Sequence, residues 1–363
     1  MNSDAIAWAE RACRSVMATY TPETLPPEGK WHYHQGVFLL GALRLWRRTG
    51  DESLYEYAKR YVDHNIAPDG SFEYRKGELD AIQAGMLLFP LWERTKDERY
   101  RTAMRTLARL LESRPTTSDG GFWHKEIYPN QLWLDGLYME GPFAVRYAEL
   151  FDEPRFYDIV ADQAFLIERH TRDPKTGLLR HAWEETRNTS WADPATGRAP
   201  EFWGRAMGWF PAALLDMLDR LPADHRAREG MIAMYRSLIE AIVKVQDEKT
   251  GLWYQVLDKG DRPENWLETS CSSLFVYSLS KGVTVGLLDR SYAQYARKGF
   301  EGVLTKISGT DDGRIEIRDI CVGTGVGNYE HYIKRDRKTN DLHGVGAFVL
   351  STIELQRMNE TLG

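Results

Sequence analysis

A repeated pattern of two helices followed by a glycine turn limits what this chain can fold into. Apolar residues recur at helical spacing through most of the sequence, and pairs of such segments are separated by turns of related composition. The turn glycines stand 50, 57, 74 and 62 residues apart: Gly70, Gly120, Gly177, Gly251 and Gly313. Each follows Asp or Thr, a combination that favours the positive φ of a tight turn. A regular alternation of this kind predicts a repeat architecture.

The predicted helices occupy most of the chain between these turns. In chain order they are the ranges 35–48, 53–64, 80–93, 99–113, 137–151, 156–170, 205–220, 231–246, 272–281 and 291–304. A further amphipathic helix is predicted within residues 1–20. Strand-like alternation is confined to short pieces such as 313–318. The residues that follow each turn are expected to form short β-hairpins.

Five such turns, together with the Pro-rich segment 21–30, delimit six helical units. Six helical hairpins closed into a ring form an (α/α)6 barrel, an all-α fold whose longer loops and short β-hairpins gather on one face. An open array of four or five hairpins is the competing arrangement, but the evenness of the pattern favours closure. We find no interdomain linker, so we predict one catalytic domain over residues 1–363, although the length alone would allow more.

Composition excludes several functional classes. The net charge is −6 and the basic residues are scattered, so we predict no nucleic-acid partner. Residues 1–20 lack the apolar core of a signal peptide, and no apolar run is long enough to cross a bilayer. Cys13, Cys271 and Cys321 are widely spaced and odd in number, which argues against a disulfide framework. We therefore expect a cytoplasmic protein without a membrane partner, of unknown oligomeric state.

Aromatic side chains are concentrated in the predicted loops. The chain has 12 Trp, 18 Tyr and 13 Phe residues. The loop tryptophans are Trp31, Trp123, Trp133, Trp183, Trp191, Trp203, Trp253 and Trp266. Such side chains often only cover a core, but flat aromatic faces also suit the apolar faces of sugar rings. Their placement in loops, where binding residues concentrate, favours carbohydrate binding.

Three polar residues occupy equivalent junctions between a loop and the helix that follows it. Asp80 and Arg205 open predicted helices, and Asp135 stands between Trp133 and Tyr138 where a loop becomes a helix. If the hairpins point the same way around a ring, these three residues converge on one pocket. Two carboxylates in one pocket suit glycosidic chemistry, because one can be kept protonated and the other ionised. A neighbouring arginine suits a substrate carboxylate.

Each of these residues also has an ordinary structural explanation. Asp80 and Asp135 can both be helix N-caps. Arg205 can pair with Glu201 one turn earlier on a helix, and His181 can bond a loop carbonyl. The sequence leaves these alternatives open, although the matching positions of the two acids favour function.

Other kinds of site find less support. His32 and His34 alternate in the manner of a metal-binding pair, but no third ligand is evident, so we expect no metal. No Gly-rich phosphate loop stands between a strand and a helix, and no Gly-x-Ser-x-Gly segment is present. We therefore expect no cofactor. His124 and Lys125 are adjacent, so at most one of them need point into a pocket.

Four segments of this chain resemble a known family. They are Trp133-Leu-Asp-Gly-Leu-Tyr-Met-Glu-Gly-Pro-Phe143, His181-Ala-Trp183, Trp191-Ala-Asp-Pro-Ala-Thr-Gly197 and Pro200-Glu-Phe-Trp-Gly-Arg-Ala-Met-Gly-Trp209. The segments are similar to those of unsaturated rhamnogalacturonyl hydrolases, which form glycoside hydrolase family 105. The unsaturated glucuronyl hydrolases of family 88 are related to them. The resemblance extends from about residue 30 to the C-terminus.

The resemblance implies an (α/α)6 barrel that removes a 4,5-unsaturated uronic acid from the non-reducing end of an oligosaccharide left by a lyase, with rhamnogalacturonan as the expected source. It implies that Asp135 is the general acid/base and that Asp80 assists as a second acid. It also implies substrate contacts for Tyr33, His124, Lys125, Trp133, His181, Trp203, Arg205 and Trp209. Which basic residue holds the substrate carboxylate, and which uronic acid and aglycone are accepted, stay open.

The chemistry of such a substrate is that of a vinyl ether. Protonation at C4 of the C4=C5 double bond gives a cation that the ring oxygen stabilises, and the resulting carboxylate can then activate water for attack at C5. One residue, Asp135, would serve as acid and then as base. We therefore expect its pKa to be raised, through desolvation by the aromatic wall and repulsion from Asp80.

Two rival functions remain at this point. A sugar epimerase or isomerase on a similar helical barrel would rely on histidine bases, for which His181 and His331 are the weak candidates. A non-catalytic carbohydrate-binding scaffold would keep the tryptophans but would not need two acids at equivalent junctions. The loops 187–197 and 323–340 are expected to set the preference for the aglycone.

Overall fold

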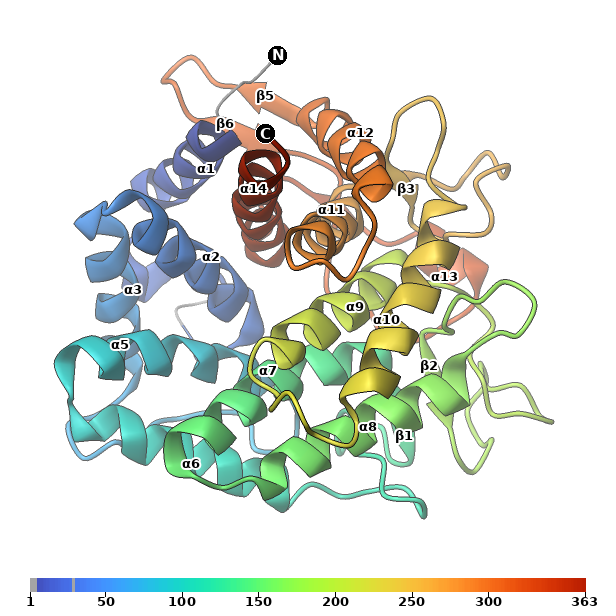
Figure 1. Cartoon of the computed structure of the whole chain (residues 1–363), viewed down its shortest axis with the longest axis horizontal. Helices are drawn as coiled ribbons and strands as arrows, with labels where there is room; N and C mark the ends of the chain where they lie inside the picture. Colours follow the sequence, from blue (N-terminus) through green and yellow to red (C-terminus); the bar gives the residue numbers. More distant parts are fainter. Residues whose placement is uncertain (1–4, 28–29) are drawn as a thin grey trace.

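The helices form two concentric rings, one inside the other (Figure 1). The structure, a computed structural model, describes residues 5–27 and 30–363. The inner ring consists of α2 (Tyr33–Thr49), α4 (Asp80–Gln83) with the 3-10 turn η2 (Ala84–Leu87) and α5 (Leu88–Thr95), α7 (Leu134–Phe151), α9 (Gly204–Leu218), α11 (Thr269–Thr284) and α14 (Leu342–Leu362). The outer ring consists of α1 (Ala5–Thr19), α3 (Glu52–Asn65), α6 (Glu98–Glu112), α8 (Arg155–Thr171), α10 (Arg228–Val243) and α12 (Ala293–Leu304).

Sequence composition separates the two rings. The outer helix α6 buries an apolar stripe that includes Tyr100, Met104 and Leu107 and turns its charged side chains to solvent. The inner helices α9 and α11 are buried along nearly their whole length. Small residues let the inner helices approach closely: a Cβ atom on Gly346 of α14 would lie 2.6 Å from the backbone N of Phe38 in α2.

The inner ring is closed, because α14 lies against both α11 and α2. The predicted (α/α)6 barrel is therefore confirmed. The Pro-rich segment 21–30 delimits the sixth unit as predicted, because it links the outer helix α1 to the inner helix α2, and among its described residues it forms the short turn η1 (Pro22–Thr24). The sixth pair of helices is made by the two ends of the chain, with α1 packed on α14. Helix α14 was not predicted, because burial on almost all sides gives it no amphipathic pattern.

The predicted helix 80–93 is interrupted. It is divided into α4, the 3-10 turn η2 and α5. Pro90 has no backbone N–H and therefore cannot donate to the preceding turn, which accounts for the change of helical geometry there. Of the N-terminal prediction 1–20, residues 1–4 lie outside the described part of the chain, and Ala5–Thr19 is helical.

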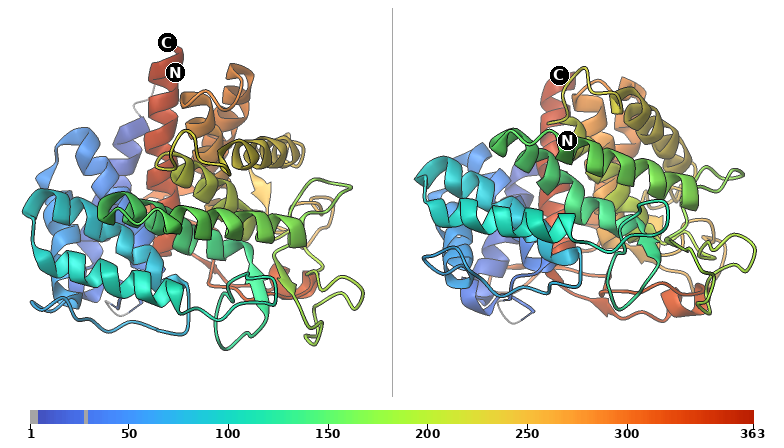
Figure 2. Two further views of the ribbon diagram at one scale, coloured as in Figure 1. Left: turned by 60° about the horizontal axis from the view of Figure 1, so that its bottom comes forward. Right: turned by 90° about the horizontal axis from the view of Figure 1, so that it is seen from below.

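The five repeat glycines all have the left-handed backbone that the sequence predicted. Their φ values are 84°, 96°, 75°, 75° and 83° for Gly70, Gly120, Gly177, Gly251 and Gly313. Each turn follows an outer helix and begins a longer loop that leads to the next inner helix. All these loops consequently gather on one side of the barrel, the lower side in Figure 2. The N-termini of the inner helices open onto this loop face.

The loops contain four two-stranded antiparallel sheets. They pair β1 (Gln131–Trp133) with β2 (Ala182–Glu184), β3 (Trp253–Tyr254) with β4 (Leu267–Glu268), β5 (Ile307–Gly309) with β6 (Ile315–Ile317), and β7 (Ile320–Cys321) with β8 (Arg337–Lys338). The β1–β2 pair joins two different loops, so it fixes their relative position rather than forming a hairpin. A further short helix, α13 (Tyr329–Ile333), lies between β7 and β8, and η3 (Arg290–Tyr292) precedes α12. None of the helices described here is long and apolar enough to cross a bilayer.

Candidate active site

The three residues predicted to converge lie in the first turns of neighbouring inner helices. Asp80 begins α4, Asp135 is the second residue of α7, and Arg205 is the second residue of α9. Helix α7 contacts both α4 and α9. The repeat therefore does place these side chains on the same face of the ring. Neither acid is a helix cap, because no side-chain cap bond is made at the start of α4 or α7.

Asp135 is the acceptor at the end of a hydrogen-bonded row. His181 Nε2 lies 3.1 Å from Asp135 Oδ2, and His181 Nδ1 lies 2.6 Å from the hydroxyl of Tyr332. The backbone N–H of Gly327 donates to that hydroxyl, which leaves its proton free to donate to Nδ1. This arrangement assigns the His181 proton to Nε2, facing the carboxylate. The alternative that His181 bonds a loop carbonyl is wrong.

The second oxygen of Asp135 is available to a ligand. Among the described residues, no hydrogen-bond partner is found for Oδ1. The side chain keeps 12% of its surface exposed. Asp135 is thus held firmly on one side by His181 and open on the other.

The expected rise in the pKa of Asp135 is wrong for the ligand-free protein. Burial does raise the pKa, but the hydrogen bond from His181, with the electrostatic effect of His181, His124 and Arg205, outweighs burial and lowers it. Asp80 does not contribute the expected repulsion, because its own charge is compensated. The free enzyme therefore holds Asp135 as a carboxylate.

Asp80 lies in a compact group of charges. Lys125 Nζ contacts Asp80 Oδ2 at 2.6 Å and Glu78 Oε2 at 2.9 Å, and His124 Nε2 lies 3.4 Å from Asp80 Oδ1. Burial opposes ionisation of Asp80, but His124 and Lys125 hold its pKa well below the usual range. Both neighbouring residues, His124 and Lys125, therefore face the site, where the sequence required only one.

Arg205 is almost fully buried, with 1% of its surface exposed. Its guanidinium donates to the backbone carbonyls of Cys321 and Val322 and lies 4.4 Å from the ring centroid of Trp203. It does not pair with Glu201, which instead contacts Lys259. Among the described residues Arg205 makes no ion pair, so its charge is not neutralised by a carboxylate in contact with it.

Aromatic rings surround the Asp135–His181 pair. Trp133 stacks on His124 with ring centroids 4.6 Å apart and on Tyr128 with centroids 5.2 Å apart. Its edge faces His181. Trp203 also contacts His181, with ring centroids 4.6 Å apart. Trp133 and Trp203 thus both contact the histidine that holds Asp135.

Tyr33 and Trp209 differ in how they relate to this group. Tyr33 is buried at the start of α2, close enough to Arg205, Asp80 and Asp135 for their charges to affect its pKa, which burial raises well above its usual range. Trp209 stacks on Tyr138 deeper in the barrel, with centroids 4.4 Å apart. Among the described residues, Trp209 has no aromatic contact or hydrogen bond with another residue of the predicted site.

The loop tryptophans are mostly structural. Trp31, Trp203, Trp253 and Trp266 belong to the main hydrophobic core. Trp133 belongs instead to a small separate cluster with Ala182 and Ala199, against which Trp191 and Val326 pack. The alternative that loop tryptophans only cover a core therefore holds for these four, and Trp133 is the one whose ring lies in a separate cluster.

Sequence reasoning missed several polar residues of the loop face. Tyr332 comes from α13, Glu78 precedes α4, and Asp341 and His343 stand at the start of the unpredicted helix α14. Asp341 and His343 could be found only if α14 was recognised first. Glu78 stood just before the predicted helix 80–93, and Tyr332 had no such signal.

The similarity to known proteins agrees with this geometry. A family model described as Glycosyl Hydrolase Family 88 matches residues 8–359. The chain belongs to glycosyl hydrolase family 88. It is also similar to the solved family 105 glycoside hydrolase of C. acetobutylicum ATCC 824, with 35% identity and a TM-score of 0.92, covering 96% of this chain and 99% of that one.

Two further similar proteins have named activities. The family 88 chain is 25% identical over 325 residues to unsaturated rhamnogalacturonyl hydrolase YesR of Bacillus subtilis (strain 168), covering 87% of each chain. The unsaturated glucuronyl hydrolase of Bacillus sp. GL1, at 16% identity and a TM-score of 0.68, shares the fold; the match covers 97% of this chain and 96% of that one. The protein is therefore a glycosidase of the unsaturated glycuronyl hydrolase group, and neither an epimerase nor a binding scaffold.

Proposed function

We propose that this family 88 enzyme removes a 4,5-unsaturated uronic acid from the non-reducing end of a lyase-generated oligosaccharide by hydrating the C4=C5 double bond. The single observation that carries the proposal is the state of Asp135. One of its oxygens is fixed by His181, the other has no partner among the described residues, and aromatic rings flank the pair. A group so placed can transfer a proton to a ligand without losing its orientation.

The reaction proceeds in two proton transfers through the same carboxyl group. Protonated Asp135 delivers its proton to C4, which places the positive charge on C5 and the ring oxygen. The resulting carboxylate then removes a proton from the water that attacks C5. The hemiketal opens and the aglycone leaves as an alcohol, and Asp135 is again protonated for the next cycle. The bond from C1 to the aglycone is never attacked directly.

The substrate itself supplies the change in protonation that this mechanism needs. In the free enzyme His181, His124 and Arg205 lower the pKa of Asp135. A bound uronate brings a negative charge near Asp135 and excludes water, and both effects raise the pKa of a carboxyl group. We propose that binding of the anionic sugar protonates the acid at the moment when it is needed.

Arg205 is the cation best suited to the substrate carboxylate. Lys125 is already shared between Asp80 and Glu78, and His124 faces Asp80. Arg205 has no ion-pair partner among the described residues, and its charge reaches Asp135. In this proposal Asp80 keeps Lys125 and His124 in place, so it assists the acid by positioning rather than by proton transfer.

The aglycone site is proposed to lie over Trp133. The loops 187–197 and 323–340 meet there, since Trp191 from one loop and Val326 from the other pack on the same small cluster. Tyr128 stacks on Trp133 and is exposed. A relative is named for rhamnogalacturonyl substrates, and we propose an unsaturated galacturonyl–rhamnose unit as the preferred substrate.

The remaining proposals concern the whole chain. We propose that residues 1–363 act as one catalytic domain, which is supported by the family model that spans residues 8–359. We propose a cytoplasmic location, which is supported by three cysteines that are all free and buried.

The decisive experiment compares three disaccharides with the wild-type enzyme. Unsaturated galacturonyl–rhamnose should lose its ultraviolet absorbance, unsaturated glucuronyl disaccharide should lose it more slowly, and saturated galacturonyl–rhamnose should not be cleaved. In D2O, NMR should find deuterium at C4 of the released uronic acid. Cleavage of the saturated sugar at a similar rate, or product without deuterium at C4, would contradict the hydration mechanism.

A further inference from the structure

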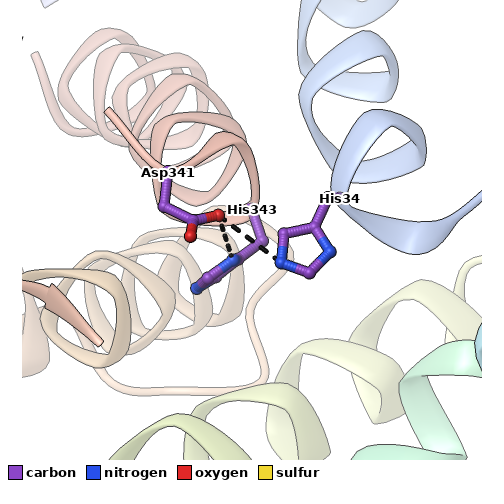
Figure 3. Close-up of side chains that lie close together, drawn as sticks. All are labelled: His34, Asp341 and His343. Carbon is purple, nitrogen blue, oxygen red and sulfur yellow. Dashed lines mark ion pairs between the residues drawn. The ribbon is translucent and has the colours of Figure 1, made fainter. Parts of the chain in front are cut away.

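Three side chains that the proposed reaction does not use meet at the seam between the first and last inner helices. His34 is the second residue of α2, Asp341 directly precedes α14, and His343 is the second residue of α14. His34 Nε2 lies 3.5 Å from Asp341 Oδ1, and His343 Nδ1 lies 2.9 Å from the same oxygen. Figure 3 shows both imidazole rings turned toward this carboxylate.

The distances between the three donor atoms suit a metal ion. All three atoms lie within 4.8 Å of one another. Ligands bound at about 2.0–2.2 Å in a tetrahedral site are roughly 3.4 Å apart. Two imidazoles and one carboxylate form a donor set that first-row divalent transition metals accept, with one position left for water.

The ring nitrogen of His34 that faces away from Asp341 has the hydrogen bond expected of a metal-binding histidine. His34 Nδ1 lies 2.8 Å from Nδ1 of His32, which also accepts weakly from the backbone N–H of His34. Nδ1 of His32 therefore acts as an acceptor. The neutral ring of His34 is then protonated at its own Nδ1, which leaves the lone pair of its Nε2 facing Asp341. A hydrogen bond on the far nitrogen that fixes the tautomer is the usual companion of a ligating histidine.

His343 supplies a second and independent indication. Its side chain is fully buried, and neither ring nitrogen has a hydrogen-bond partner among the described residues. Nδ1 is close to Asp341 Oδ1 without the geometry of a hydrogen bond. A buried imidazole is normally satisfied, and a metal ion between the two groups would use the lone pair of Nδ1.

The second group of possible ligands on this face already contacts a cationic side chain. His32, Glu78 and Asp80 also lie close together, but the ammonium of Lys125 contacts both carboxylates. A cation is therefore already present there, and a metal ion would have to displace it.

We infer that His34, Asp341 and His343 form a binding site for one first-row divalent transition metal ion, of which Zn²⁺ is the representative. The ion joins the first inner helix, α2, to the last, α14, at the point where the two ends of the sequence close the barrel. The inference goes beyond the proposed glycosidase function and does not depend on it.

Calorimetric titration of the metal-free full chain with Zn²⁺ tests the site. Wild type should bind one ion per chain, and His34→Ala and His343→Ala should each weaken binding at least about 100-fold. His32→Ala, which removes only the outer hydrogen bond, should weaken it by about 10-fold. The matched control is His225→Ala, because His225 also lies 3.5 Å from an aspartate, Asp158, yet belongs to no such group.

Two further observations make the result decisive. Co²⁺ added to wild type should give the intense visible bands of a low-coordinate site, and these bands should be absent from His34→Ala. Circular dichroism establishes that each variant is folded; if His343→Ala is not, His34→Ala decides alone, since its ring is partly exposed. The inference is overturned if wild type takes up no Zn²⁺, or if uptake is the same in His34→Ala.

Discussion

Two buried aspartates at opposite ends of the barrel show how a functional carboxylate differs from a structural one. Asp216, near the end of α9, has both oxygens occupied: Arg44 Nη2 contacts Oδ2 at 2.8 Å, and Lys281 Nζ and the hydroxyl of Tyr277 contact Oδ1. Asp135, at the start of α7, has one oxygen bound to His181. Both oxygens of Asp216 are therefore bound by protein groups, whereas one oxygen of Asp135 has no partner among the described residues.

The two acids also differ in how completely the cations around them are paired with carboxylates. A cavity of about 350 Å³ next to Asp216 is lined by arginines and lysine, including Arg44, Arg146 and Lys281. These cations lie at the ends of inner helices opposite the loop face, where positive charge is favourable. At the loop face, Lys125 is paired with Asp80 and Glu78, but Arg205 has no paired acid among the described residues. Complete pairing of the buried charges therefore distinguishes the end opposite the loop face, and incomplete pairing distinguishes the loop face.

The largest expected effect is that of Asp135→Asn. Asparagine keeps the shape of the side chain and can still accept from His181, but it cannot deliver a proton to C4. We expect kcat to fall about 10³-fold, or ~4 kcal/mol in the barrier, with the free energy of unfolding changed by less than about 1 kcal/mol. Steady-state kinetics and urea denaturation measure the two quantities. Near-normal turnover would remove Asp135 from the mechanism.

Asp216→Asn should lower stability while leaving turnover nearly unchanged, the opposite of Asp135→Asn. Removing one charge from a buried network leaves Arg44 and Lys281 without their partner, which should cost about 3 kcal/mol of stability. Turnover per folded molecule should stay close to wild type, since the cluster lies away from the loop face. Urea denaturation and active-site-normalised kinetics test this. Equal loss of activity and stability in both Asn variants would erase the distinction drawn between the two acids.

Lowering the pH should affect the stability of wild type and of Asp216→Asn differently. The network of Arg44, Lys281 and Tyr277 holds the pKa of Asp216 well below its usual value against the opposing effect of burial. Its stabilising contribution is thus fully present above the unfolded value of about 3.9 and is lost as the pH falls below it. Unfolding free energies measured from neutral pH downward should fall more steeply for wild type than for Asp216→Asn. Parallel curves would show that Asp216 is not the linked group.

The pH dependence of turnover should reveal the environment of Asp135. His181 lowers the pKa of Asp135 in the free enzyme, so kcat/KM should decline as the pH rises above that lowered value. The decline in kcat should begin at a higher pH, because bound substrate raises the pKa. His181→Asn removes the hydrogen bond and should move the decline in kcat/KM to higher pH. Coincident profiles of kcat and kcat/KM would contradict protonation by the substrate.

The smallest effect is expected at the rim of the loop face. Tyr128→Ala removes an exposed ring that stacks on Trp133. We expect KM for the disaccharide to rise about 5-fold, as for the loss of one stacking contact, while stability changes by no more than about 0.5 kcal/mol. Initial-rate measurements suffice. An unchanged KM would place the aglycone elsewhere.

Much of the fold followed from local sequence features, and the exceptions have physical causes. The turn glycines and the amphipathic helices were predictable because each depends on neighbouring residues alone. Helix α14 was missed because it is buried on nearly all sides, so its residues show no polar face. Asp80, Asp135 and Arg205 were found because the repeat places them at equivalent junctions. Asp341 and His343 were missed with the helix that carries them.

The sequence by itself determined the helical repeat, the left-handed turns and the position of the acid at the start of an inner helix. Only the tertiary structure decided which helices are inner, how the two chain ends close the ring, and how each carboxylate is compensated. The pKa of Asp135 illustrates the reason. Its aromatic neighbours in the sequence predicted a raised value, but His181, brought from 46 residues away, lowers it. Electrostatic balance depends on distances in space, which neighbours along the chain do not specify.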